Sequence, residues 1–169
     1  YWIRRVIDRL SGSRSVCADD LDGDGDLDLV VAVHYDDAIR WWENDGNPRG
    51  TGWASHSIAP GGSFVGVWDV EVGDVDGDGD LDVVGSASED NEVRWWENTE
   101  IDGAQVFVPR LIASGITDVR GIALADLDRD GDLDIAGAPR GYHLLVWWEN
   151  SGAAPPTWTT HFVGHGVEG

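Results

Sequence analysis

The sequence predicts an all-β fold assembled from three copies of one repeat, each made of four short strands. Two markers recur along the 169 residues, at spacings of 54 and then 52 residues. One is a nine-residue acidic loop. The other is a Trp-Trp-Glu-Asn segment whose first Trp follows the first Asp of the loop by 21 residues. Because both markers keep the same spacing, they belong to one repeating unit, and a repeat of this length decides the architecture.

The acidic loop has an aspartate at positions 1, 3, 5, 7 and 9 and a glycine at position 6. Its copies occupy residues 20–28, 74–82 and 126–134. The loops contain fifteen of the 32 acidic residues, so the net charge of −21 comes largely from them. Carboxylates packed this closely repel one another, and a bound cation relieves that repulsion. The alternative is a solvated acidic turn that holds no metal.

Each repeat reads as four strands, because β-branched and aromatic residues alternate with turns rich in Gly, Pro and Asn. The first strand of each repeat is expected at residues 15–18, 67–72 and 121–125, and the second at 27–33, 81–87 and 133–138. The third carries the Trp pair, and the fourth surrounds Ile58, Leu111 or Phe162. Four-stranded repeats of about 40 to 50 residues are typical of β-propeller blades.

The whole chain, residues 1–169, is predicted to be a single propeller segment. The approximate repeats are 9–59, 60–113 and 114–163, and residues 1–8 are expected to add an extra outer strand. Closed propellers have about 4 to 8 blades, so three blades are too few to close a ring. We therefore expect a homo-oligomer, a dimer giving about six blades. The remaining blades of a longer protein are the alternative.

The loop pattern Asp-x-Asp-Gly-Asp-Gly-x-Leu-Asp, followed by a short apolar strand, resembles the FG-GAP/VCBS repeat. That repeat builds the integrin α-chain propeller and occurs in many bacterial surface proteins. The resemblance implies that each loop joins the first two strands of a blade and binds Ca²⁺ at one of three sites. It implies side-chain ligands at positions 1, 3, 5 and 9 and a backbone carbonyl ligand at position 7. The side-chain ligands would be Asp20, Asp22, Asp24, Asp28, Asp74, Asp76, Asp78, Asp82, Asp126, Asp128, Asp130 and Asp134, and the main-chain ligands Asp26, Asp80 and Asp132.

Oxygen-only loops favour calcium, which takes 6 to 8 hard oxygen ligands, and the absence of His and Cys from the loops disfavours zinc. An EF-hand is excluded, because position 12 holds Val31, Gly85 or Gly137 instead of glutamate. Arg129 replaces a glycine in the third loop and is expected either to weaken that site or to project into solvent. The leucines at position 8, which are Leu27, Leu81 and Leu133, are predicted to point inward.

The acidic composition argues against nucleic acid and anionic membranes as partners. No run of 18 apolar residues is present, so no membrane insertion is expected. The single cysteine, Cys17, excludes an internal disulfide and is predicted to be a partly buried filler. The chain lacks an initiator Met and a signal peptide, which is typical of a mature, excised or engineered segment.

Nine of the ten tryptophans sit at recurring positions, so we interpret them as packing residues between blades. Trp68 is the exception, and the equivalent positions hold Arg14 and Arg120. Turns that differ between repeats add Tyr35 and Tyr142. Variable residues on a rigid frame often bind partners, so these five residues are the candidate ligand-binding surface, for a glycan or a protein.

No catalytic motif is recognisable, and His56 and His161 occupy the same repeat position as Arg5 and Arg110, which predicts a positional role. The chain is therefore expected not to be an enzyme. We predict a calcium-binding module with a structural, adhesion or recognition role. Calcium loops of extracellular modules bind with a Kd of roughly 10⁻⁴ to 10⁻³ M, which favours a secreted or cell-surface location. The alternatives are a lectin-like propeller, an engineered or fragment repeat protein without an evolved ligand, and, less favoured, a polysaccharide-acting enzyme.

Overall fold

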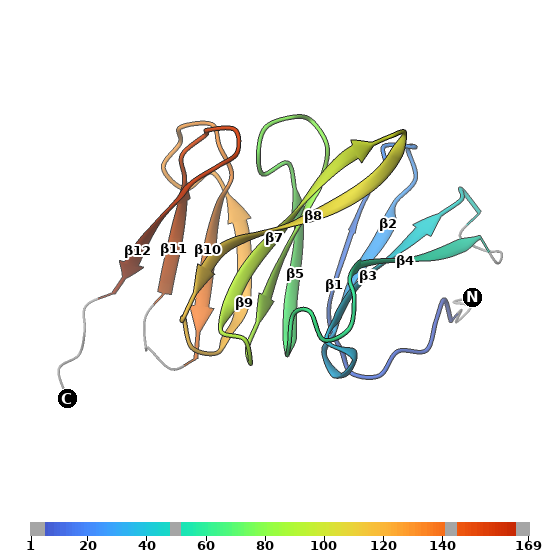
Figure 1. The fold of residues 1–169 in the computed structure, drawn as a ribbon, viewed down its shortest axis with the longest axis horizontal. Coiled ribbons are helices and arrows are strands. Elements are labelled where there is room, and N and C mark those ends of the chain that lie inside the picture. The colour runs from blue at the N-terminus through green and yellow to red at the C-terminus, as the bar shows by residue number, and fades with distance from the viewer. Residues whose placement is uncertain (1–5, 48–51, 141–144, 165–169) are drawn as a thin grey trace, which may run out of the picture.

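The computed structural model describes residues 6–47, 52–140 and 145–164. These residues form three four-stranded antiparallel sheets. Within the described ranges the only helical element is one 3₁₀ turn, His34–Asp36. The sheets stand side by side in a row, with the first and third at opposite ends (Figure 1). The prediction of an all-β chain with three four-stranded repeats is confirmed.

Every sheet contains four strands that are consecutive in the chain. The first sheet contains β1 (Ser13–Asp19), β2 (Asp28–Val33), β3 (Ala38–Asn44) and β4 (Trp53–Ala59). The second contains β5 (Val67–Gly73), β6 (Asp82–Ala87), β7 (Glu92–Ile101) and β8 (Ala104–Ser114). The third contains β9 (Val119–Ala125), β10 (Asp134–Pro139), β11 (Leu145–Asn150) and β12 (Trp158–Val163). Strands β1, β5 and β9 neighbour one another in succession, so each sheet radiates outward from them.

The strand register gives the two residues of each Trp pair opposite roles. Successive side chains of a strand point to opposite faces of the sheet. Trp41 and Trp95 therefore pack against the following sheet, while Trp96 and Trp148 pack against the preceding one. Five of the six paired tryptophans are buried. The interpretation of the pairs as packing residues between repeats is confirmed for Trp41, Trp95, Trp96 and Trp148, whereas Trp42 is buried among residues of its own repeat.

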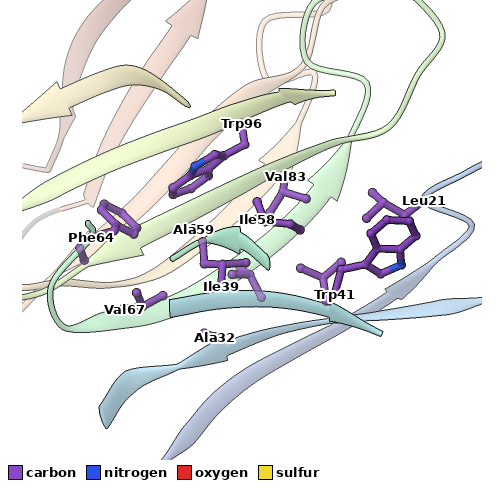
Figure 2. Close-up of a cluster of buried hydrophobic side chains, with 13 residues drawn as sticks. Leu21, Ala32, Ile39, Trp41, Ile58, Ala59, Phe64, Val67, Val83 and Trp96 are labelled. Atoms are coloured by element: carbon purple, nitrogen blue, oxygen red, sulfur yellow. The ribbon is translucent and has the colours of Figure 1, made fainter. Parts of the chain in front are cut away.

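Two apolar cores fill the spaces between neighbouring sheets. The first joins residues of the first and second sheets, among them Ile39, Trp41, Phe64 and Trp96 (Figure 2). Phe64 meets Trp96 edge to face, with ring centroids 5.1 Å apart. The second core joins the second and third sheets around Trp95 and Trp148. Because each core needs two sheets, no repeat buries its hydrophobic residues alone.

The outer ends of the row differ from the sequence prediction. Residues 1–5 lie outside the described residues, and residues 6–8 of the expected outer strand form no strand. Residues Val6 to Leu10 instead border a hollow beside Trp42. The row of three sheets does not close into a ring (Figure 1).

Candidate metal centres in the acidic loops

The three acidic loops occupy the same place in each repeat. Each connects the first strand to the second, β1 to β2, β5 to β6 and β9 to β10, and all three lie along the upper edge of the row in Figure 1. The expected position of the loop between the first two strands of each repeat is therefore confirmed. The repeats place three acidic centres at equivalent points of the fold.

Carboxylate oxygens converge in every loop. Three aspartates in each loop place one oxygen apiece within 4.8 Å of the others. The groups are Asp20, Asp22 and Asp24; Asp74, Asp76 and Asp78; and Asp126, Asp128 and Asp134. Positions 1, 3 and 5 thus meet in the first two loops, and positions 1, 3 and 9 in the third. Each group could hold a metal ion with hard oxygen ligands.

The loop backbone holds these carboxylates in place. In all three loops the position-5 N–H donates to the position-3 carboxylate, at 3.1, 3.3 and 3.1 Å. The position-7 N–H donates to the position-5 carboxylate, at 2.8, 2.9 and 3.1 Å. In the first two loops the glycine N–H at position 6 also donates to the position-1 carboxylate. The curl of the loop therefore turns alternate side chains toward one centre.

Position 9 has a structural role in addition to its predicted one. Asp28, Asp82 and Asp134 are fully buried. One oxygen of each accepts the N–H of loop position 2, and the other accepts the N–H of the Asn that ends the Trp-Trp-Glu-Asn segment, at 2.7 to 2.9 Å. These carboxylates thus tie the loop to the third strand, and an ion would have to share them.

Burial raises the pKa of Asp22, Asp28, Asp76 and Asp82. Burial is the largest cause for Asp82, whose pKa rises to about 7 although two backbone N–H groups oppose the shift. Burial also raises the pKa of Asp28, again against its backbone donors. For Asp22 and Asp76 burial is again the largest cause, and nearby carboxylates add to it. Metal-free loops therefore hold their negative charge at a cost that a bound cation would offset.

The position-7 side chains do not join the carboxylate groups. A Cβ built on Gly46 would lie 2.6 Å from an oxygen of Asp26, and one on Gly152 would lie 2.1 Å from an oxygen of Asp132. Both side chains therefore lie against the turn after the third strand. This placement is compatible with the backbone ligand implied for position 7.

Arg129 stands where the other loops have glycine. Its φ is +69°, close to the +74° of Gly23 and the +75° of Gly77. Left-handed backbone is unfavourable for a residue with a Cβ. The Arg129 side chain is exposed, so the structure agrees with the expectation of projection into solvent.

The prediction that the position-8 leucines all point inward is wrong for Leu27, which is 61% exposed. Leu81 packs against the first core, and Leu133 lies against Gly73 of the preceding sheet. The residue at position 8 thus faces the preceding repeat. Leu27 is exposed because no repeat precedes the first one in this structure. In the first two loops the fully inward residues are Leu21 and Val75, at position 2.

Sequence reasoning missed the function of the Asn that follows each Trp-Trp-Glu. The Nδ2 of Asn98 donates to the carbonyl of Leu81 in its own loop and to that of Leu21 in the preceding loop, at 3.0 and 3.3 Å. Asn150 does the same with Leu133 and Val75, at 3.1 and 2.8 Å. Each amide therefore connects two successive acidic loops. Recurrence of the Asn in all three repeats was the available signal.

The repeat position shared by His56, Arg110 and His161 lies on the fourth strand and pairs with a glutamate of the third strand. The Nε2 atom of His56 lies 2.7 Å from a carboxylate oxygen of Glu43, and that of His161 lies 2.6 Å from one of Glu149. At the same position in the second repeat, Arg110 donates a hydrogen bond to Glu97. The two histidine rings also stack on the first Trp of their sheets, with centroids 4.5 Å apart. The predicted positional role of this slot fits these contacts.

Four of the five candidate ligand-binding residues come together at the end of the strands opposite the acidic loops. The guanidinium carbons of Arg14 and Arg120 lie 4.7 and 4.1 Å from the ring centroid of Trp68. Arg14 also lies 5.7 Å from the ring of Tyr35. Tyr142 is outside the described residues. All three repeats thus contribute to one cluster of arginine and aromatic side chains.

Comparison with known families agrees with this geometry. The FG-GAP-like repeat matches residues 20–85 and 74–137, two overlapping segments that each begin at an acidic loop. The chain belongs to the FG-GAP-like repeat family. Both matched segments run from one loop through the Trp pair into the next loop and strand, so this FG-GAP-like chain carries its loops in the repeat context of the family. A search of the curated proteins found no match. Across the described residues, no helix of this FG-GAP-like chain has the length and apolarity to cross a membrane.

Proposed function

We propose that this FG-GAP-like chain is a calcium-binding, propeller-type module that works outside the cell in a structural, adhesion or recognition role, without catalysis. The observation that carries the proposal is the threefold recurrence of converging carboxylates at one point of the repeat. A single acidic cluster is common on protein surfaces. Three equivalent clusters, each curled by the same backbone hydrogen bonds, support a shared ligand.

Calcium is the proposed ion because the loops offer oxygen ligands only, and because calcium accepts irregular geometry and high coordination numbers. The site is proposed to use Asp side chains at positions 1, 3, 5 and 9 and the carbonyl at position 7. Binding to the folded state alone stabilises it: at a free Ca²⁺ concentration ten times Kd, each site adds about 1.4 kcal/mol. Three occupied loops would thus make the fold calcium-dependent.

Calorimetric titration of chelator-stripped protein tests this role. We expect three Ca²⁺ per chain, falling to two when Asp22→Asn and Asp24→Asn are combined to remove two carboxylates of the first loop. Asp102→Asn is the matched control, since Asp102 is exposed and lies outside the loops. A chain that melts at the same temperature in Ca²⁺ and in excess chelator would contradict the proposal.

The proposed location follows from affinity. Extracellular calcium modules bind with a Kd of roughly 10⁻⁴ to 10⁻³ M, which leaves them empty at cytosolic calcium levels. The same titration measures this Kd. A value near 10⁻⁸ M, typical of cytosolic buffers, would remove the argument for an extracellular site of action.

A second candidate function rests on the cluster around Trp68. Arg14 and Arg120 bring two guanidinium groups together on a chain whose net charge is −21. Guanidinium groups bind carboxylates and sulfates well, so we propose an acidic glycan as the ligand of this face. Five of the six paired tryptophans are buried, which makes the grooves between repeats less suitable for stacking on a sugar. A glycan array comparing the native chain with Arg14→Ala tests this: loss of acidic-glycan signal supports it, and equal signals contradict it.

A further inference from the structure

We propose that this chain binds a second copy of itself head to tail, with the outer face of its third sheet docked on the outer face of the first sheet of the other copy. The proposal goes beyond ion binding and names a partner. Both halves of the contact are present in one chain. The two internal junctions between sheets serve as the template.

The trailing face is the outer face of the third sheet, and it comprises Leu127, Leu145 and Val163. Leu145 is 55% exposed, whereas Ile39 and Val93 at the equivalent position are completely buried. Leu127 is 45% and Val163 50% exposed. In the other repeats the position of Leu127 holds Leu21 and Val75, and the position of Val163 holds Ile58 and Ile112. All four of these residues are less than a tenth exposed. The trailing face thus carries the residues that bind a following sheet, but nothing covers them within the described residues.

The leading face is the outer face of the first sheet, and it comprises Val16 and Leu27. Val16 is 62% exposed, whereas Val70 and Ile122 at the equivalent position are 2% and 7% exposed. Leu27 is exposed while its equivalents pack on the preceding sheet. Val16 and Leu27 therefore have no partner within the described residues, whereas Trp42 and Val33 of the same sheet are already buried in a cluster with Leu10. An apolar face of this kind is typical of an interaction surface.

The asparagine of the first repeat marks the same missing contact. Asn98 and Asn150 each reach back to the position-2 carbonyl of the preceding loop. Within the described part of the chain, Nδ2 of Asn44 donates only to Leu27 of its own loop. The carbonyl of Leu127, at position 2 of the third loop, is the equivalent acceptor that a following Asn would reach. Asn44 of one copy and Leu127 of another thus complete the repeat pattern.

Residues Val6 and Ile7 border the leading face beside Trp42. They are 54% and 43% exposed, but Trp42 beside them is only 3% exposed, and Val31 and Val33 are 7% and 0% exposed in a cluster that also contains Leu10. A second copy that docked in the register of the internal junctions would displace them from Trp42. Such a contact is heterologous, because it uses different faces on the two copies, and a ring of two chains contains two identical joints.

Sedimentation velocity in Ca²⁺ tests the proposal with one charged substitution on each face. The native chain is expected to have the mass of two chains. Val16→Arg and Leu145→Arg each place a charge within the apolar contact and should weaken self-association by at least tenfold, giving single chains. Ile101→Arg is the matched control, because Ile101 is 51% exposed at the end of β7, away from both faces. It should keep the two-chain mass.

Mixing the two variants separates a head-to-tail contact from other dimers. The Val16→Arg chain keeps an intact trailing face and the Leu145→Arg chain an intact leading face, so an equimolar mixture should regain a two-chain species through one joint. Circular dichroism of each variant confirms that it is folded. A native chain with a single-chain mass overturns the proposal. So does a Val16→Arg chain that still dimerises, or a mixture that stays at single-chain mass.

Discussion

The asparagine that joins successive loops gives the sharpest stability prediction. Asn150→Leu removes two hydrogen bonds from Nδ2, those to Leu133 and to Val75, and the bond that Oδ1 accepts from the Gly152 N–H. A net loss of about 1 kcal/mol per bond, with about 1 to 2 kcal/mol more for the buried Val75 carbonyl left without a donor, gives about 4 to 5 kcal/mol. The backbone N–H of residue 150 still reaches Asp134, so the loop keeps that anchor.

Asn44→Leu is the internal control for this prediction. Asn44 occupies the same repeat position but makes a single side-chain donation, at 3.2 Å, and it has no preceding loop to reach. Its replacement should lower the free energy of unfolding by about 1 kcal/mol. Equilibrium urea unfolding at fixed Ca²⁺, followed by tryptophan fluorescence and circular dichroism, measures both. The Val16→Arg background keeps the chains single during the measurement. Equal losses in the two variants, within 0.5 kcal/mol, would refute the idea that the bond between loops contributes to stability.

Three further outcomes are expected. Arg129→Gly should stabilise the chain by about 1 kcal/mol in calorimetry, since it relieves left-handed backbone, while Gly77→Ala should destabilise it by a similar amount. In metal-free protein, Asp82 has a folded pKa of about 7 against 3.8 for a free carboxyl, so the folded state binds more protons between these values. Stability should therefore fall by about 3 kcal/mol as pH rises from about 4 to 7, and Asp82→Asn should flatten this slope in urea titrations at several pH values. Burial, with Glu71 nearby, raises the pKa of the Cys17 thiol, so it should react with a thiol reagent more slowly than free cysteine at pH 8, and equal rates would contradict this.

The repeat spacing predicted the strands well. The second strands were expected at 27–33, 81–87 and 133–138, and they begin within one residue of those limits. This accuracy has a physical origin, because a loop of fixed length and a Trp pair at fixed distance leave little freedom for the strands between them. The fourth strand was located less well: β8 begins at Ala104, well before the expected segment around Leu111, because the turn at Asp102 and Gly103 extends the β7–β8 hairpin.

The loop chemistry was predictable in part. Alternating carboxylates indicated convergence, and positions 1 and 3 converge in all three loops. The inward leucine was assigned to position 8 instead of position 2, because the loop sequence alone does not reveal which side faces the core. That choice depends on the neighbouring sheet, as the contrast between Leu27 and Leu81 shows. The amide of Asn98 was missed for the same reason, since its acceptor Leu21 lies 77 residues away in the chain.

The amide of Asn98 holds two loops at once, so the loops are not thermodynamically independent. An ion that orders the first loop fixes the Leu21 carbonyl and, through Asn98, restrains the second loop before its own ion arrives. The conformational entropy lost at the first binding step is then not lost again at the second. Asn150 extends the same linkage to the third loop. Calcium uptake along this chain should be positively cooperative between neighbours, with the middle loop coupled on both sides and the outer loops on one.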